Sequence, residues 1–195
     1  MPRKSGTKTT AVYIVRASDA PWGDYGHILV HGMTGHLGRL DGRLQLERTG
    51  PFIPPTTHPG GRDIVLTDWA KRLLETSLAG LHFRSVSLAK IVHLDWRRWD
   101  PSAPEPAEYP QSGEPEDYIL ERKHDESLAD EMGPVWELRP DIDPAIQDRG
   151  KFVVSAYRGQ PLVRASELGG YSFVSAAMRD ALERVGRPWI EFRPA

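Results

Sequence analysis

Two stretches of the chain, residues 63–86 and 171–194, show the same order of apolar and polar positions. Each begins with a short β-branched or aromatic run, continues with apolar residues three and four apart, and ends with alternating apolar and polar residues. These patterns are typical of a strand, a helix and a second strand. The sequence therefore predicts a strand–helix–strand unit used twice, with chance convergence of two capped helices as the alternative.

Local signals mark the helix boundaries in both units. Thr67 and Ser175 follow the first strand of their units, and a hydroxyl there can accept from the free amides of the first helical turn. Gly186 and Pro188 are typical of a helix end, and Gly80 follows the first helix in the same way. We expect both units to pack into one body, because the connecting stretch has too few apolar residues to form a domain alone.

The remaining apolar patterns predict mostly strands in the N-terminal part of the chain, and both strands and helices after it. A short helix is expected in "DESLADEMG" (125–133), with Asp125 and Glu126 near its start and Gly133 after its end. Strands are expected at "AVYIVRA" (11–17), "HILVH" (27–31), "GRLQLER" (42–48), "AKIVHLDW" (89–96) and "KFVVSAYRG" (151–159). The predicted fold is a single α+β domain over residues 11–195, with a mixed or antiparallel sheet and a few helices. Residues 1–10 are basic and polar and are expected to form a disordered tail.

Composition narrows the possible functions. The chain has 195 residues, of which 39% are hydrophobic, so it can build a real core. Its net charge of −2 gives no overall basic field for nucleic acid or an anionic membrane. Cysteine is absent, which excludes disulfides, thiolate zinc sites and thiol nucleophiles and suits a reducing cytosol. The early apolar run "AVYIV" is too short to span a membrane.

Residues 100–143 differ from the rest of the chain by being strongly acidic. Their many Asp and Glu residues face only three basic ones, Arg122, Lys123 and Arg139. The segment also contains Tyr109, Tyr118 and Trp136, so it is not a purely solvated tail. We expect an irregular acidic segment between the two repeated units.

Several histidines near the glycine-rich stretch suggest a metal site, with His27, His31, His36 and His58 as candidate ligands. On the predicted strand, His27 and His31 would share a face but lie roughly 13 Å apart at about 3.3 Å per residue. That separation is too large for one ion. We therefore predict neither a metal site nor a cofactor.

Other chemical motifs are weak. The loop from Gly32 to Gly42 could present amides to a phosphate, but it matches neither nucleotide-binding glycine motif. Paired carboxylates such as Glu114 and Glu116 occur in any acidic segment, and no nucleophile motif is present. We predict no catalytic residues. The alternative is a small hydrolase or nucleotide-binding enzyme that uses this loop with His31 or His36.

"DWRRWD" interleaves tryptophans with Arg97 and Arg98, a pattern that would suit stacking on single-stranded nucleic acid. Asp95 and Asp100 cancel this charge, so direct nucleic-acid binding is not the favoured prediction. A more suitable candidate is a protein interface, because exposed acid steers a basic partner and aromatic rings supply buried area. The candidate partner-binding residues are Glu114, Glu116, Asp117, Tyr118, Asp125, Glu126 and Trp99. Tyr118 turned inward beside a solvated loop is the alternative.

From Leu44 to the end, the chain resembles a known family. The stretches "LQLERTGPFIPP", "LDWRRWD", "SGEPEDYIL" and "FVSAAMRDALERVGRPWIEFRP" are similar to bacterial immunity proteins encoded beside polymorphic toxins. One branch of these proteins carries paired C-x-x-C-G motifs, which this chain lacks, so a zinc-ribbon role does not apply. The resemblance implies a cytoplasmic protein without catalysis that binds a cognate toxin. An acidic surface would complement a basic active-site cleft on that toxin.

Overall fold

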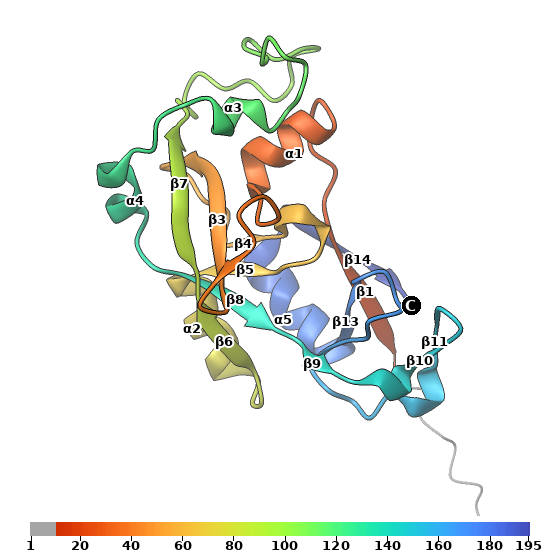
Figure 1. The fold of residues 1–195 in the computed structure, drawn as a ribbon. Coiled ribbons are helices and arrows are strands. Elements are labelled where there is room, and N and C mark those ends of the chain that lie inside the picture. Colours follow the sequence, from red (N-terminus) through yellow and green to blue (C-terminus); the bar gives the residue numbers. More distant parts are fainter. Residues whose placement is uncertain (1–10) are drawn as a thin grey trace, which may run out of the picture.

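The computed structural model describes residues 11–195 (Figure 1). The prediction for residues 1–10 lies outside this range. The largest sheet is mixed and has the strand order β14-β1-β13-β12-β9. Its strands are β1 (Val12–Ala17), β9 (Asp141–Ile142), β12 (Leu162–Arg164), β13 (Ser172–Ser175) and β14 (Ile190–Pro194). All its neighbouring strands are antiparallel except β12 and β9.

Two further sheets continue the body. The antiparallel sheet β4-β5-β8-β6 consists of β4 (Thr56–Thr57), β5 (Val65–Thr67), β6 (His82–Ser85) and β8 (Val135–Arg139). The sheet β2-β3-β7 consists of β2 (Arg39–Leu40), β3 (Arg43–Gly50) and β7 (Ser87–His93), with β3 and β7 parallel. A hairpin joins β10 (Gln147–Asp148) and β11 (Lys151–Phe152).

The helices are α1 (Asp24–His31), α2 (Asp68–Ser77), α3 (Asp117–Leu120), α4 (Glu126–Met132) and α5 (Ala176–Gly186). Short 3₁₀ turns occur at Pro59–Gly61, Pro144–Ile146 and Val154–Ala156. In residues 11–195 no helix has the length and apolar character needed to cross a membrane. The α+β prediction is confirmed.

The repeated unit is present in both predicted places. In the first copy β5 leads into α2 and then β6, and β5 and β6 lie on either side of β8. In the second copy β13 leads into α5 and then β14, and these two strands lie on either side of β1. The predicted caps are confirmed, since the Thr67 hydroxyl accepts from the Ala70 amide at 3.3 Å and the Ser175 hydroxyl from the Met178 amide at 3.1 Å. Each unit therefore receives its central strand from elsewhere in the chain.

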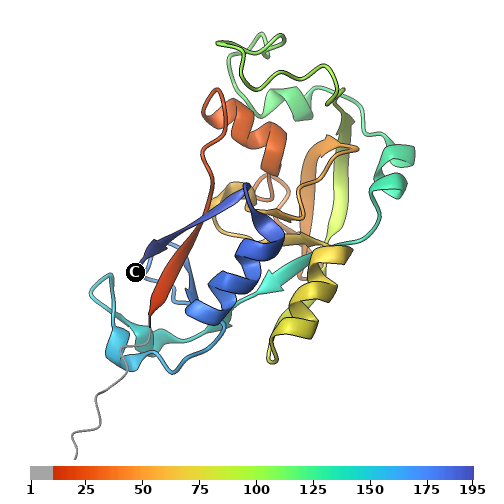
Figure 2. The same ribbon diagram turned by 180° about the vertical axis from the view of Figure 1, so that it is seen from behind.

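The two units share one hydrophobic core. Helices α2 and α5 lie together on the same side of the sheets (Figure 2). Leu74 and Leu182 pack there against Leu66 and Val174 from the strands, and all four side chains are buried. Burying a leucine side chain contributes about 2 kcal/mol, so this shared core stabilises both copies at once.

The predicted strand at residues 27–31 is wrong, because these residues belong to α1. The run is buried on nearly every side, so it lacks the one-sided periodicity that separates helix from strand. Gly32, with φ 73°, ends the helix, and its amide donates to the Ile28 carbonyl. At Gly26 a Cβ atom would stand 1.8 Å from the Pro21 carbonyl oxygen, so only glycine fits. Tertiary packing therefore overrides the β-branched composition.

The predicted irregular segment at 100–143 and the predicted strand at 151–159 also differ from the structure. Residues 135–142 form β8 and β9, and Glu137 is buried in β8 at 4% exposure. Of residues 151–159 only Lys151–Phe152 form a strand, which a 3₁₀ turn follows. The strands expected at 11–17 and 42–48 correspond to β1 and β3, and the helix expected at 125–133 is α4. The strand expected at 89–96 corresponds to β7, which ends at His93, so residues 94–96 lie outside it.

Candidate functional site

The irregular part of the acidic segment forms a lobe at one end of the molecule. We call residues 95–133 the acidic lobe; it follows β7, contains α3 and α4, and precedes β8. Figure 1 shows its loops beyond α1 at one end, with α4 beside β7. The lobe therefore presents a surface apart from the two repeated units.

Aromatic side chains hold the start of the lobe against α1. The Trp96 and Trp99 rings meet edge to face with centroids 4.5 Å apart, and Trp99 meets Trp22 at 5.6 Å. The Trp22 indole donates to the Ala103 carbonyl at 2.9 Å, and the Tyr25 hydroxyl donates to the carbonyl of Glu108 at 2.5 Å. These contacts order a segment that has little regular structure.

The later part of the lobe is joined to the open edge of β7. The Ile91 amide donates to His124 Nδ1, and the Asp125 amide donates to the Ile91 carbonyl, both at 2.9 Å. Lys90 Nζ also donates to the Leu120 carbonyl. The lobe thus covers backbone groups that would otherwise lie exposed at an edge strand.

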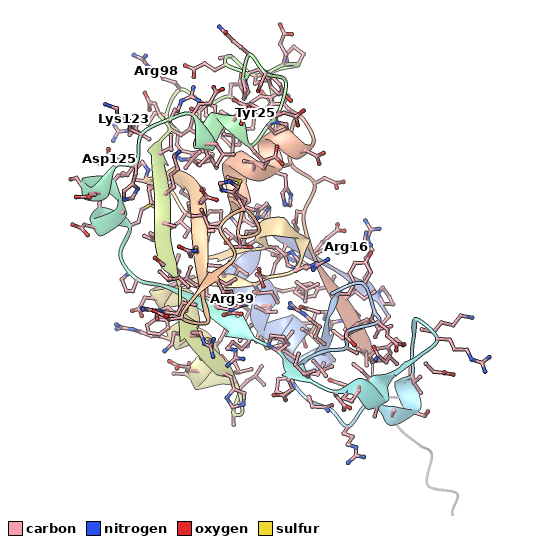
Figure 3. The ribbon with its side chains drawn as sticks, viewed as in Figure 1. Arg16, Tyr25, Arg39, Arg98, Lys123 and Asp125 are labelled. Atoms are coloured by element: carbon pink, nitrogen blue, oxygen red, sulfur yellow. The ribbon has the colours of Figure 1, made fainter. Side chains whose placement is uncertain are left out.

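The acidic candidates for partner binding form two groups, one at α3 and one at α4. Glu114 and Glu116 are exposed, and Asp117 lies half-buried beside them in the first turn of α3. Glu126 is exposed on α4, where the Asp125 carboxylate accepts from the Leu128 amide at 3.0 Å and caps the helix. Asp125 and Lys123 lie on the α4 side of the molecule and Arg16 on the side of β1 (Figure 3).

The aromatic candidates are internal supports. Tyr118 is 4% exposed, and its ring packs against Tyr25 while the Arg122 guanidinium lies 3.7 Å from the ring centroid. The expectation of Tyr118 as an exposed anchor is wrong, and the inward alternative holds. Trp99 is half-buried. Both side chains line a hollow of about 490 Å³ beneath the lobe, together with Arg98.

Most carboxylates of the lobe have no cation beside them. Within residues 95–133 as the structure describes them, the ion pairs are Arg122 with Glu108 at 3.1 Å and Arg98 with Asp95 at 3.4 Å. No ion pair occurs there at the exposed Glu114, Glu116 or Glu126. Like charges that remain unpaired repel one another, and a cationic partner relieves this repulsion.

A groove that the sequence did not reveal runs along α1 below the lobe. Its first hollow, of about 450 Å³, is lined by Arg16, Asp24, His27, His58 and Tyr171 among others. The second, of about 350 Å³, shares Asp24 and His27 and adds Ile28, Met33, Glu114 and Glu116. We call the two hollows together the histidine groove. Its residues come from distant parts of the chain, so no local pattern in the sequence could have predicted it.

The histidines of this region are held neutral by burial. Burial lowers the pKa of His31 to about 3, with a further contribution from nearby His27, and it lowers the pKa of His58 to about 4. The pKa of His27 is also lowered by burial. His31 Nδ1 accepts from the His58 amide at 3.3 Å. Within the described part of the chain, neither ring nitrogen of His58 has a hydrogen-bond partner.

The strand spacing that would keep His27 and His31 too far apart for one metal ion does not occur in the structure. Because α1 is a helix, the rings of His27 and His31 lie 4.7 Å apart between centroids rather than at strand spacing. Across residues 11–195, however, no group of three or more His, Cys, Asp or Glu side chains has an arrangement that could hold an ion.

The loop from Gly32 to Gly42 is tied to the sheets by side chains. His36 Nδ1 lies 3.0 Å from the Glu47 carboxylate, and the Thr34 hydroxyl donates to Asp63 at 2.8 Å. Arg39 donates to both oxygens of Glu137. His31 is buried in α1, whereas His36 is about half exposed, and neither lines the groove. The enzyme alternative needs His31 or His36 in a hollow near a carboxylate, and neither residue lines the two hollows of the groove.

Comparisons with known proteins found no match: no family model, no curated protein sequence and no solved structure is similar to this chain at a significant level.

Proposed function

We propose that this protein is a cytoplasmic immunity protein that binds a cognate bacterial toxin and covers its active site, without catalysis of its own. The observation that carries the proposal is the acidic lobe, in which exposed carboxylates without ion-pair partners stand on a well-anchored support. Such a surface is complementary to a basic cleft. The resemblance of residues 44–195 to immunity proteins supports the same function.

The anchoring of the lobe supports a role in binding. An ordered surface loses less conformational entropy when a partner docks than a flexible segment does. The rings of Trp22, Trp96 and Trp99 fix the start of the lobe, and the β7 edge fixes its later part. The carboxylates of Glu114 and Glu116 are therefore presented on a prepared surface.

The enzyme alternative has less support. A nucleotide-binding glycine loop needs free backbone amides that face a phosphate. Here the side chains of the loop itself contact acidic residues: His36 and Arg39 contact carboxylates of β3 and β8, and Thr34 contacts Asp63, which precedes β5. The carboxylates that these side chains contact, from Glu47, Asp63 and Glu137, disfavour a phosphate at the loop.

The proposal is tested with the reading frame next to the gene for this protein. The neighbouring product is expressed alone and together with this chain, and growth and co-purification are measured. We expect growth arrest by the neighbour alone, rescue on co-expression, and a complex of the two chains. A neighbour that is harmless alone, or that arrests growth equally with and without this chain, contradicts the proposal.

A further inference from the structure

Among residues 11–195, the second hollow of the histidine groove is lined by several carboxylates and by no lysine or arginine. Three carboxylates, from Asp24, Glu114 and Glu116, line the second hollow. Asp24 lies in the first turn of α1 and the two glutamates come from the acidic lobe, and all three residues are exposed. Within the part of the chain that the structure describes, none of the three forms an ion pair. The second hollow is therefore a concentrated negative site.

The floor of the second hollow is apolar. Ile28 and Met33 line it between the carboxylates, and both are buried. Arginine and lysine side chains combine a long apolar stem with a charged end, and they commonly lay the stem along apolar surface. A rim of carboxylates above an apolar floor matches this combination. His27, which burial keeps neutral, adds no opposing positive charge.

The first hollow has different chemistry. Arg16 lies there over the Tyr171 ring, 5.5 Å from its centroid, and it shares the hollow with Asp19 and Asp24, so this end already holds a cation among its carboxylates. His58 lines the same hollow at 2% exposure, and its two ring nitrogens lack partners. A buried polar group without a hydrogen bond destabilises the fold, and a partner that supplies the bond relieves this cost. This unmet hydrogen-bonding capacity is an observation independent of the carboxylates.

The geometry points to the histidine groove as the binding site for a basic segment of the protein partner. One arginine or lysine side chain of that segment is enclosed by Asp24, Glu114 and Glu116. This inference rests on the proposed function, because it names the part of the toxin that the acidic surface receives. The cationic side chain occupies the second hollow. The neighbouring backbone of the segment runs past His27 toward His58 in the first hollow.

The test uses the whole chain and a blocked tetra-arginine peptide, with a tetra-glutamate peptide as the control ligand. Titration of the ¹⁵N-labelled protein at low salt is followed by NMR. We expect saturable shifts at the amides of Asp24, His27, Gly60 and Glu116 with the arginine peptide alone. No saturable shifts, or shifts centred on α4, would overturn the inference.

Two matched variants sharpen this test. Asp24→Asn with Glu116→Gln removes two charges from the groove, and Asp130→Asn with Glu131→Gln removes two from exposed positions of α4. We expect the groove variant to raise the Kd for the peptide by about tenfold and the α4 variant by less than about twofold. Equal weakening by both variants would show a general charge effect and contradict a site in the groove.

The neighbouring gene product separates this inference from the proposed function. If the groove variant binds that protein as tightly as the unchanged chain does, the partner docks elsewhere; the groove inference then fails and the proposed function stands. If the protein does not bind the unchanged chain at all, the proposed function fails. Selective peptide binding in the groove would then support only a site for cationic segments.

Discussion

The guanidinium of Arg39 donates to both carboxylate oxygens of Glu137, at 2.9 and 2.7 Å, across 98 positions of sequence. Arg39 lies in the short strand β2, while Glu137 lies in the central part of β8. The Glu137 side chain is 5% exposed and that of Arg39 is 40% exposed. This bidentate contact joins the glycine-rich loop to the sheet of the first repeated unit, and it gives that loop a structural role.

Removing the cation from this contact should destabilise the fold. Arg39→Met leaves a buried carboxylate without its main partner, and we expect the free energy of unfolding to fall by about 2–3 kcal/mol. Urea denaturation measures the change. Arg72→Met is the control, because the Arg72 side chain is 76% exposed in its pair with Asp68 and should cost less than about 0.5 kcal/mol. Equal losses in the two variants would contradict the role of the buried contact.

The two repeated units should respond alike to loss of their caps. Thr67→Ala and Ser175→Ala each remove a hydroxyl that accepts from a first-turn amide. Each change should lower the free energy of unfolding by about 1 kcal/mol, whereas Thr67→Ser should restore most of the loss. Thermal and urea unfolding check both values. A cost in one copy alone would show that the caps are not equivalent.

Stability should fall in mild acid because of the buried histidines. The folded-state pKa of His31, about 3, and that of His58, about 4, lie below the ordinary value of 6.5. At pH values between the folded-state pKa and 6.5, the unfolded chain binds more protons than the folded chain. The free energy of unfolding therefore decreases as pH falls below about 6.5. Each histidine contributes a slope of up to about 1.4 kcal/mol per pH unit.

Urea midpoints between pH 7.5 and 4.5 measure this dependence. His58→Asn should flatten it by removing one of the buried groups, while His93→Asn at an exposed position should leave it unchanged. If the two variants give the same slope as the unchanged chain, the acid sensitivity arises from other groups.

Charge reversal on the lobe should slow association with the toxin. Glu114→Lys with Glu116→Lys replaces two exposed carboxylates, and we expect the association rate constant to fall by about tenfold with a smaller change in dissociation. Stopped-flow or surface-based kinetics at two salt concentrations give both constants. Asp148→Lys with Glu167→Lys makes the same net change at exposed positions outside the lobe. A similar slowing there would contradict the placement of the interface on the lobe.

Glycine at position 26 should be essential to the packing of α1. Gly26→Ala places a methyl group 1.8 Å from the Pro21 carbonyl oxygen, so the helix or the preceding loop must shift. We expect a loss of about 3 kcal/mol or more, as for other overpacked sites. Gly35→Ala is the control, because a Cβ atom there has no neighbour within 4 Å. Unfolding measurements that show equal stability for the two variants would contradict the described approach of α1 to Pro21.

Local patterns in the sequence predicted the features that local physics controls. The hydroxyls of Thr67 and Ser175, the helical spacing that follows them, and the alternation after Gly80 and Pro188 are all readable within one element. They gave the repeated unit and the α+β class correctly. The same is true of α4, whose cap is Asp125 and whose end is Gly133.

The features that the sequence could not predict depend on distant parts of the chain. Residues 27–31 became a helix because packing around Gly26 and Gly32 decides their conformation, and their even burial removes the periodic signal. In the sequence Glu137 belongs to an acidic run, but in the structure it is buried, and its partner Arg39 lies 98 positions away. The histidine groove is formed by α1, His58 and the lobe, and no local spacing in the sequence predicts that these segments lie together.

The placement of β1 between β13 and β14 has a consequence for synthesis of the protein. Val12 pairs with Ser175, and Val15 pairs with Phe192, so β1 can pair with both neighbours only after residues 172–194 have left the ribosome. Until then β1 offers two unpaired edges that can bind other strands. A chain that lacks β13 and β14 would leave both edges of β1 open to aggregation and proteolysis, so correct folding of β1 depends on segments more than 150 residues away.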